Sequence, residues 1–172
     1  IKDVENVPYP EKLIVPFIDT VHNRVVLELF RGCTRGCRFC QAGMIYRPIR
    51  EKSVERLKEI VDKLVKSTGY DEISLSSLST SDYSKLTELT DYLVDEYASN
   101  NIGISLPSLR LDNFSMEIAE KIQQVRKSGL TFAPEAGTQR LRDVINKGVS
   151  EEGLQNATKK AFEMGWNSVK LY

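Results

Sequence analysis

Residues 31–44 read Arg31-Gly32-Cys33-Thr34-Arg35-Gly36-Cys37-Arg38-Phe39-Cys40-Gln41-Ala42-Gly43-Met44 and contain every cysteine of the 172-residue chain. Three residues separate the first cysteine from the second, and two separate the second from the third. Three thiolates this close, with no fourth nearby, provide three ligands of a cubic iron–sulfur cluster and leave its fourth iron open. The glycines of this stretch allow the backbone to fold tightly around a bulky inorganic group. The stretch therefore predicts a metal centre that accepts a further ligand.

Other uses of three cysteines fit the sequence less well. A structural zinc site takes four ligands, and the single histidine, His22, lies well before Cys33 in a predicted turn. An odd number of cysteines disfavours a disulfide framework. A cluster that only transfers electrons uses a fourth cysteine, which this chain lacks. The open iron–sulfur cluster is therefore the preferred interpretation, with a zinc site or a simple iron–sulfur site as the alternative.

Composition describes an ordinary globular domain. The chain is 41% hydrophobic and 28% charged, and its formal net charge is zero. Its length suffices for one domain with a core of its own. No apolar run predicts a membrane span, and no signal peptide is visible, so we expect a cytoplasmic protein in a reducing compartment. The balanced charge gives no indication of nucleic-acid binding.

Hydrophobic patterning predicts an α/β fold. Apolar runs rich in branched residues alternate with helical stretches, and connections of this length indicate a parallel sheet with right-handed crossovers. No glycine-rich phosphate loop follows the first strand, which disfavours a dinucleotide-binding fold. The expected strands are residues 24–30, 71–78, 102–106, 130–133 and 168–172. The expected helices cover residues 53–67, 83–99, a stretch capped by Ser115, 138–146 and 150–164.

The chain divides into two parts by composition. Residues 1–23 carry three prolines and predict an N-terminal extension or a lead-in strand over residues 13–18. Residues 24–172 form the predicted core. Because the chain starts without methionine and stops within the fifth strand, we expect it to be part of a longer protein whose C-terminal part is missing.

Polar residues follow several of the predicted strands. Ligands of parallel α/β sheets bind at the carboxyl ends of the strands, so these residues are the candidate binding groups. Serines also favour turns and caps, and a buried serine or a surface arginine needs no ligand. The candidates are Ser79, Thr80, Ser81 and Asp82 after the second strand, Ser105, Ser108 and Arg110 after the third, and Glu135 and Gly137 after the fourth.

The cysteine spacing resembles that of a known family. Cys33-x-x-x-Cys37-x-Phe39-Cys40 is similar to the cluster motif of radical S-adenosylmethionine (radical SAM) enzymes. Residues 31–48 resemble a branch related to cobalamin-dependent radical SAM proteins and tRNA methylthiotransferases. The resemblance implies a partial (β/α) barrel of six units, of which this chain holds five. Residues 168–172 would then lie at one sheet edge with no sixth strand beside them.

The resemblance also implies cofactors and residue roles. Cys33, Cys37 and Cys40 would hold a 4Fe–4S cluster whose open iron binds SAM, with Phe39 near the adenine. Glu135 would contact the ribose hydroxyls or the amino group of SAM. Where the family has a Gly-Gly-Glu-like segment, this chain has residues 78–82. The remaining predicted cofactor contacts are Ser79, Thr80, Ser105 and Arg110.

The activity implied is reductive cleavage of SAM to a 5′-deoxyadenosyl radical that acts on an unknown substrate, with a one-electron reductant protein as partner. The rival interpretation is a non-catalytic redox sensor or docking domain. Basic residues surround the cysteines. They could raise the reduction potential of the cluster, or form a surface for an anionic substrate or a reductant protein. The alternative is a solvated basic surface without a function of this kind. These residues are Arg31, Arg35, Arg38, Arg47, Arg50 and Lys52.

Overall fold

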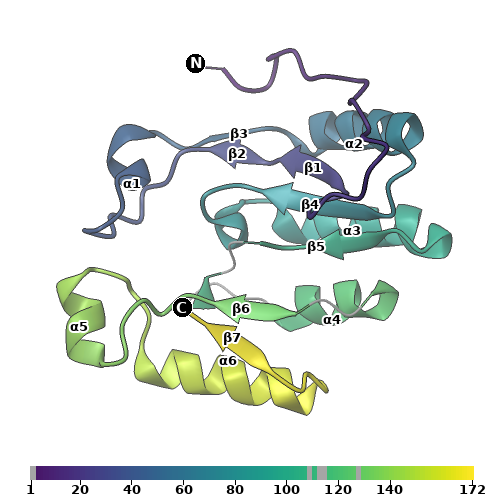
Figure 1. Cartoon of the computed structure of the whole chain (residues 1–172). Coiled ribbons are helices and arrows are strands. Elements are labelled where there is room, and N and C mark those ends of the chain that lie inside the picture. The colour runs from purple at the N-terminus through teal and green to yellow at the C-terminus, as the bar shows by residue number, and fades with distance from the viewer. Residues whose placement is uncertain (1–2, 108–109, 112–115, 127–128) are drawn as a thin grey trace.

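The computed structural model describes residues 3–107, 110–111, 116–126 and 129–172. All five predicted strands are present and pair in parallel (Figure 1). A three-stranded sheet has the order β1 (Val25–Glu28), β4 (Glu72–Ser76) and β5 (Gly103–Ser105), and a two-stranded sheet pairs β6 (Leu130–Phe132) with β7 (Val169–Leu171). A short antiparallel pair joins β2 (Phe30–Arg31) to β3 (Arg50–Glu51). The predicted α/β class and the partial (β/α)-barrel fold are confirmed.

The five parallel strands form two groups instead of one continuous sheet. Within the part of the chain that the structure describes, no ladder joins β5 to β6. The two strands are linked through α4 (Met116–Val125), and a cavity of about 620 Å³ lies between the groups. β7 pairs with β6 alone among the described strands.

Helices cover the outer face of the strands. The two long ones are α2 (Val54–Thr68) and α3 (Leu86–Tyr97), and α6 (Glu151–Glu163) packs beside β6 and β7 (Figure 1). Shorter helical segments are α1 (Ala42–Ile45), α5 (Gln139–Val144), η1 (Thr80–Asp82) and η2 (Ala98–Asn100). None of the helices described here has the length and apolar character that crossing a bilayer requires.

Local sequence explains where these helices begin. Ser53, Thr138 and Ser150 each have extended backbone and accept a hydrogen bond from the backbone N–H three residues on, which satisfies an otherwise unpaired donor. Gly69 ends α2 in the left-handed conformation, with φ of +69°. The predicted cap Ser115 lies outside the described residues.

The main core lies between the three-stranded sheet and the helices. One face of α2 packs on β1 and β4 because its apolar residues recur at helical spacing. Each fully buried leucine or isoleucine there contributes about 1.5–3 kcal/mol. The buried side chains of this interface are Val25, Leu27, Ile73, Leu75, Val54, Leu57, Val61 and Leu64.

The N-terminal segment corrects one expectation. Residues 3–23 contain neither helix nor strand, so the lead-in strand over residues 13–18 was wrong. Three prolines remove ladder donors and fix the backbone, and Phe17 is fully exposed. The segment is still anchored by side chains: the Tyr9 hydroxyl donates to the Val26 carbonyl at 2.7 Å, and Glu5 accepts from the Ser53 N–H at 2.8 Å.

Candidate functional site

The three cysteines lie in a loop, residues 32–41, that follows β2 and is called the cysteine loop below. Its base is closed by the β2–β3 pair and by a hydrogen bond from the Cys33 N–H to the Tyr46 carbonyl at 3.0 Å. Gly32 has a φ of +99°, and a Cβ there would lie 2.5 Å from the Pro48 carbonyl oxygen. The base of the loop therefore requires glycine at this position.

The cysteines are unpaired thiols that differ in exposure. Cys37 is buried, whereas Cys33 and Cys40 are half-buried, and none forms a disulfide. Over the ranges that the structure describes, no group of three or more His, Cys, Asp or Glu side chains is arranged to hold a single metal ion. A 4Fe–4S cluster does not need several side chains around one metal ion, because each of its cysteines binds a different iron.

Lys147 contacts two predicted site residues, Phe39 and Glu135, and was not itself predicted from the sequence. The Lys147 ammonium lies 3.3 Å from a Glu135 carboxylate oxygen and 5.8 Å from the centre of the Phe39 ring. Glu135 itself has a left-handed backbone, with φ of +66°, at the end of β6. A lysine that follows a short helix gives no sequence signal of such a contact, because it is typical of solvated surface.

Arg110 joins the same group of residues. Its guanidinium donates to the Lys147 carbonyl at 2.7 Å and lies 4.0 Å from the sulfur of Cys37. Its backbone N–H donates to the Ser81 hydroxyl at 3.1 Å. The structure thus brings Arg110 and Glu135 to the cysteine loop, where Lys147 links both to Phe39. The further candidate Ser108 lies outside the described residues.

The polar residues after β4 contact one another and the cysteine loop. The Ser79 hydroxyl donates to Asp82 at 2.6 Å, and the Arg35 guanidinium of the cysteine loop pairs with the same carboxylate. Thr80 is fully buried, and its hydroxyl lies 3.0 Å from that of Ser77. Asp82 therefore connects the tip of β4 to the cysteine loop, a role that the sequence did not indicate.

Ser105 lies apart from the other candidates. It lines the 620 Å³ cavity between the two groups of strands, together with Leu106, Thr131, Trp166 and Tyr172. Among the predicted site residues that the structure describes, no other lines this cavity. Ser105 therefore lies at the gap between the two groups of strands.

Several side chains of the basic run make contacts within the chain, although Arg38 and Arg47 are exposed. Arg31 and Lys52 both pair with Glu28, at 2.8 and 2.9 Å, and the Lys52 side chain is 2% exposed. Arg38 donates to the Val144 carbonyl and Arg47 to the Gly43 carbonyl. These side chains brace the loop and its surroundings, because their donors end on carbonyls and carboxylates of the same chain.

The Glu28 contacts predict a pH dependence of stability. Burial raises the pKa of the Glu28 carboxyl, but hydrogen bonds and charges of Arg31 and Lys52 outweigh it, so the net pKa is lowered. Ionised Glu28 therefore stabilises the fold above its ordinary pKa, and this contribution is lost as the pH falls through the lower folded pKa. Urea unfolding between about pH 7 and about pH 3 is expected to show falling stability, and a flatter profile in Glu28→Gln. Equal slopes for both proteins would contradict this assignment.

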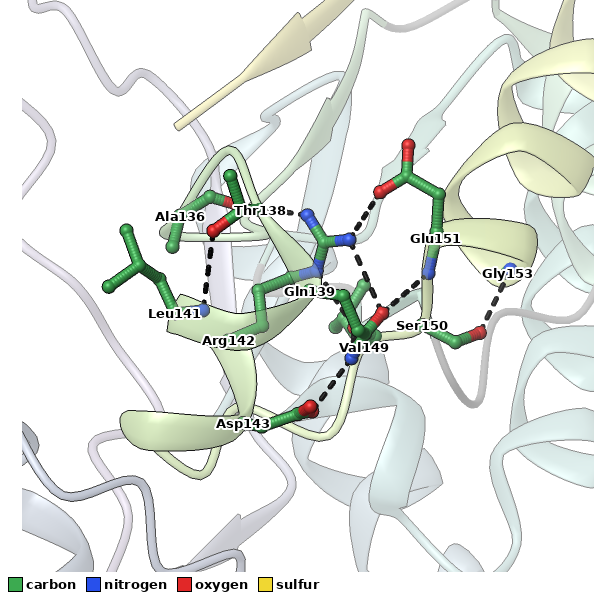
Figure 2. A network of polar contacts seen from close by, with 10 residues as sticks. All are labelled: Ala136, Thr138, Gln139, Leu141, Arg142, Asp143, Val149, Ser150, Glu151 and Gly153. Carbon is green, nitrogen blue, oxygen red and sulfur yellow. Dashed lines mark hydrogen bonds and ion pairs between the residues drawn. The ribbon is translucent and has the colours of Figure 1, made fainter.

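Arg142 holds α5 and the segments on either side of it (Figure 2). Its side chain is 1% exposed, and its guanidinium donates to the carbonyls of Ala136 at 2.9 Å and Val149 at 3.0 Å. It also donates to Gln139 at 3.3 Å and pairs with Glu151 at 2.5 Å. One buried cation thus fixes the turn after Glu135 and the start of α6, because it bonds both.

Comparison with known proteins identifies the family. A model described as the radical SAM superfamily matches residues 27–172. The chain is 36% identical over 147 residues to the uncharacterized protein MJ0966 of Methanocaldococcus jannaschii, covering 86% of this chain and 32% of that protein. It is 29% identical over 150 residues to the proposed methylthiotransferase MJ0865 of the same organism, covering 82% and 33%. The chain spans about a third of the length of these curated relatives.

Solved structures show the same fold. The cobalamin-dependent S-adenosylmethionine radical enzyme OxsB superimposes with a TM-score of 0.61 at 17% identity, over 86% of this chain and 23% of that one. Methylornithine synthase (PylB) superimposes with a TM-score of 0.57 at 17% identity, over 86% and 43%. The family match runs from β1 to Tyr172 and includes all three cysteines. The chain therefore belongs to the radical SAM superfamily.

Proposed function

We propose that this chain is the cofactor-binding core of a radical SAM enzyme. It binds a 4Fe–4S cluster through Cys33, Cys37 and Cys40 and cleaves SAM reductively for a reaction on an unknown substrate. One observation carries the proposal beyond family membership: Phe39 of the cysteine loop is linked through Lys147 to Arg110 and Glu135, which come from two other segments. A sensor or zinc module does not need a carboxylate and an aromatic ring at that place.

The donor set fits the cluster. Three thiols without a disulfide partner stand in one glycine-containing loop, and one of them, Cys37, is buried beside Arg110. Three cysteines leave one iron of a 4Fe–4S cluster open to SAM. When bound and reduced, the cluster supplies one electron to the SAM sulfonium, whose cleavage yields methionine and a 5′-deoxyadenosyl radical. Free thiols also support a reducing, cytoplasmic location and a one-electron reductant as partner.

The chain's own residues bind and orient SAM. Phe39 offers an aromatic face to the adenine, and the Glu135 carboxylate accepts hydrogen bonds from ribose hydroxyls or the amino group. The Lys147 ammonium links these two side chains, because it contacts both. Ser79, Thr80 and Ser105 remain proposed contacts of SAM. The Thr80 hydroxyl lies 3.0 Å from the Ser77 hydroxyl.

The Glu135→Ala variant tests the proposed SAM site. Loss of a charge-assisted hydrogen bond, worth about 1.5–3 kcal/mol, is expected to weaken SAM binding by about 10- to 100-fold while the cluster absorbance stays unchanged. The measurement is SAM titration of the full-length, anaerobically reconstituted protein, followed by assay of 5′-deoxyadenosine after reduction. Glu163→Ala, an exposed carboxylate on α6 that pairs only loosely with Lys159 at 3.9 Å, is the matched control.

Two results would contradict parts of the proposal. Unchanged SAM affinity in Glu135→Ala would remove this residue from the site. Full cluster occupancy in the unaltered protein without SAM cleavage would favour the non-catalytic sensor or docking module instead.

A further inference from the structure

The cysteine loop rests on the C-terminal end of α5, more than 100 residues later in the chain. The Arg38 N–H donates to the Ile145 carbonyl at 2.9 Å, and the Arg38 guanidinium donates to the Val144 carbonyl. The last carbonyls of a helix have no partner within the helix, so they are ready acceptors for another segment. Here the loop that carries the cysteines supplies the donors.

Asn146 makes the second half of this contact. Its side-chain amide donates to the Gly36 carbonyl at 2.9 Å and lies 3.5 Å from the Arg35 carbonyl. Its backbone is left-handed, with φ of +53°, which asparagine tolerates better than most residues. Gly36 is also left-handed, at +72°, so both partners occupy conformations suited to their residue types.

These contacts hold the residues immediately before and after Cys37. Gly36 precedes it and is held by Asn146, and Arg38 follows it and is held by Val144 and Ile145. The segment that holds them is itself fixed, because α5 is anchored by the buried Arg142 (Figure 2). The position of Cys37 is thus set by contacts of its two neighbours with a distant, internally bonded segment of the fold.

We propose that Asn146 is a positioning residue for the cluster ligands, and the proposal rests on the function proposed above. Its amide holds the peptide before Cys37, so that the loop presents this thiol in place when the cluster arrives. Without that donor the loop loses more conformational entropy when the cluster binds, because it becomes ordered only then.

Asn146→Gly is the sharpest variant, because glycine keeps the left-handed backbone and removes only the side-chain donor. Asn101→Gly is its matched control: Asn101 has φ of +57° after η2 and lies in another part of the fold. Asn146→Asp keeps the shape but sets a carboxylate against the Gly36 carbonyl. It should therefore have the larger effect.

The first readout needs no cofactor. Trypsin cleaves after arginine, and Arg35 and Arg38 lie within the held part of the loop. In the full-length apo-protein, loss of about 1 kcal/mol of hydrogen bonding should speed cleavage at these sites about fivefold in Asn146→Gly, and more in Asn146→Asp. Asn101→Gly should be cleaved there at the unaltered rate. Equal rates in all proteins, or equal acceleration in both glycine variants, would overturn the proposal.

The second readout is cluster retention. After anaerobic reconstitution, iron removal by a chelator should be about fivefold faster from Asn146→Gly than from Asn101→Gly, with similar thermal midpoints for the two. Retention equal to that of the unaltered protein would overturn the proposal. The failure of the proposed function has a different signature: no iron binds to any of the proteins, while digestion of the apo-protein still reports on the loop contact.

Discussion

Replacement of Cys37 by alanine is expected to abolish the 4Fe–4S cluster. Cys37 is the buried thiol of the three, and its neighbours on both sides are held by the segment after α5. With one of three ligands lost, two irons of the cluster lack protein thiolates, and assembly should fail. The measurement is iron and sulfide content, with the visible absorbance, of the anaerobically reconstituted full-length protein. SAM cleavage should fall below detection.

Alanine at Cys33 and at Cys40 should have the same effect, because each cysteine would bind a different iron of the proposed cluster. The fold should survive, since a buried thiol replaced by alanine removes little apolar surface. A variant that keeps full iron and sulfide content would remove that cysteine from the ligand set.

Replacement of Arg142 by methionine should have the largest effect on stability. The side chain is 1% exposed. Its loss removes the donor to the Ala136 carbonyl and leaves the Val149 carbonyl with a long hydrogen bond from Gln139 at 3.4 Å. Val149 is buried and the Ala136 contact is partly buried. A polar group that loses its partner in such a place costs about 1–3 kcal/mol, so we expect a loss of about 3 kcal/mol in the free energy of unfolding. The pair with Glu151 adds little to this value, because that carboxylate is 56% exposed. Urea unfolding measures the change.

Arg140→Met is the matched control for this variant. Arg140 lies on the same helix, two residues earlier, and is exposed. Its replacement should change stability by no more than about 0.5 kcal/mol. Equal small effects of both substitutions would show that the network in Figure 2 does not hold α5.

Much of the fold followed from local sequence signals. The five strands and the helix starts at Ser53, Thr138 and Ser150 were predicted, because branched apolar runs and side-chain oxygens act on their own neighbourhood. The strand-tip rule also placed Glu135 and Arg110 near the cysteine loop, since parallel strands end at a common edge.

The rest depends on contacts between distant segments. The break between β5 and β6 has no local signature, and neither does the use of Lys147 and Asn146 as partners of the loop. The partners of Arg38 and Arg47 are backbone carbonyls, which every residue carries and no pattern reveals. Similarly, Arg142 looks like any surface arginine until its four partners are seen.

The most direct test of the central claim is electron paramagnetic resonance of the full-length protein after anaerobic reconstitution and reduction, with and without SAM. The account predicts one 4Fe–4S cluster per chain whose spectrum changes when SAM is added, because three cysteines leave one iron open to it. A colourless protein with one tightly bound zinc and no iron would contradict the account, as would a cluster whose spectrum SAM leaves unchanged.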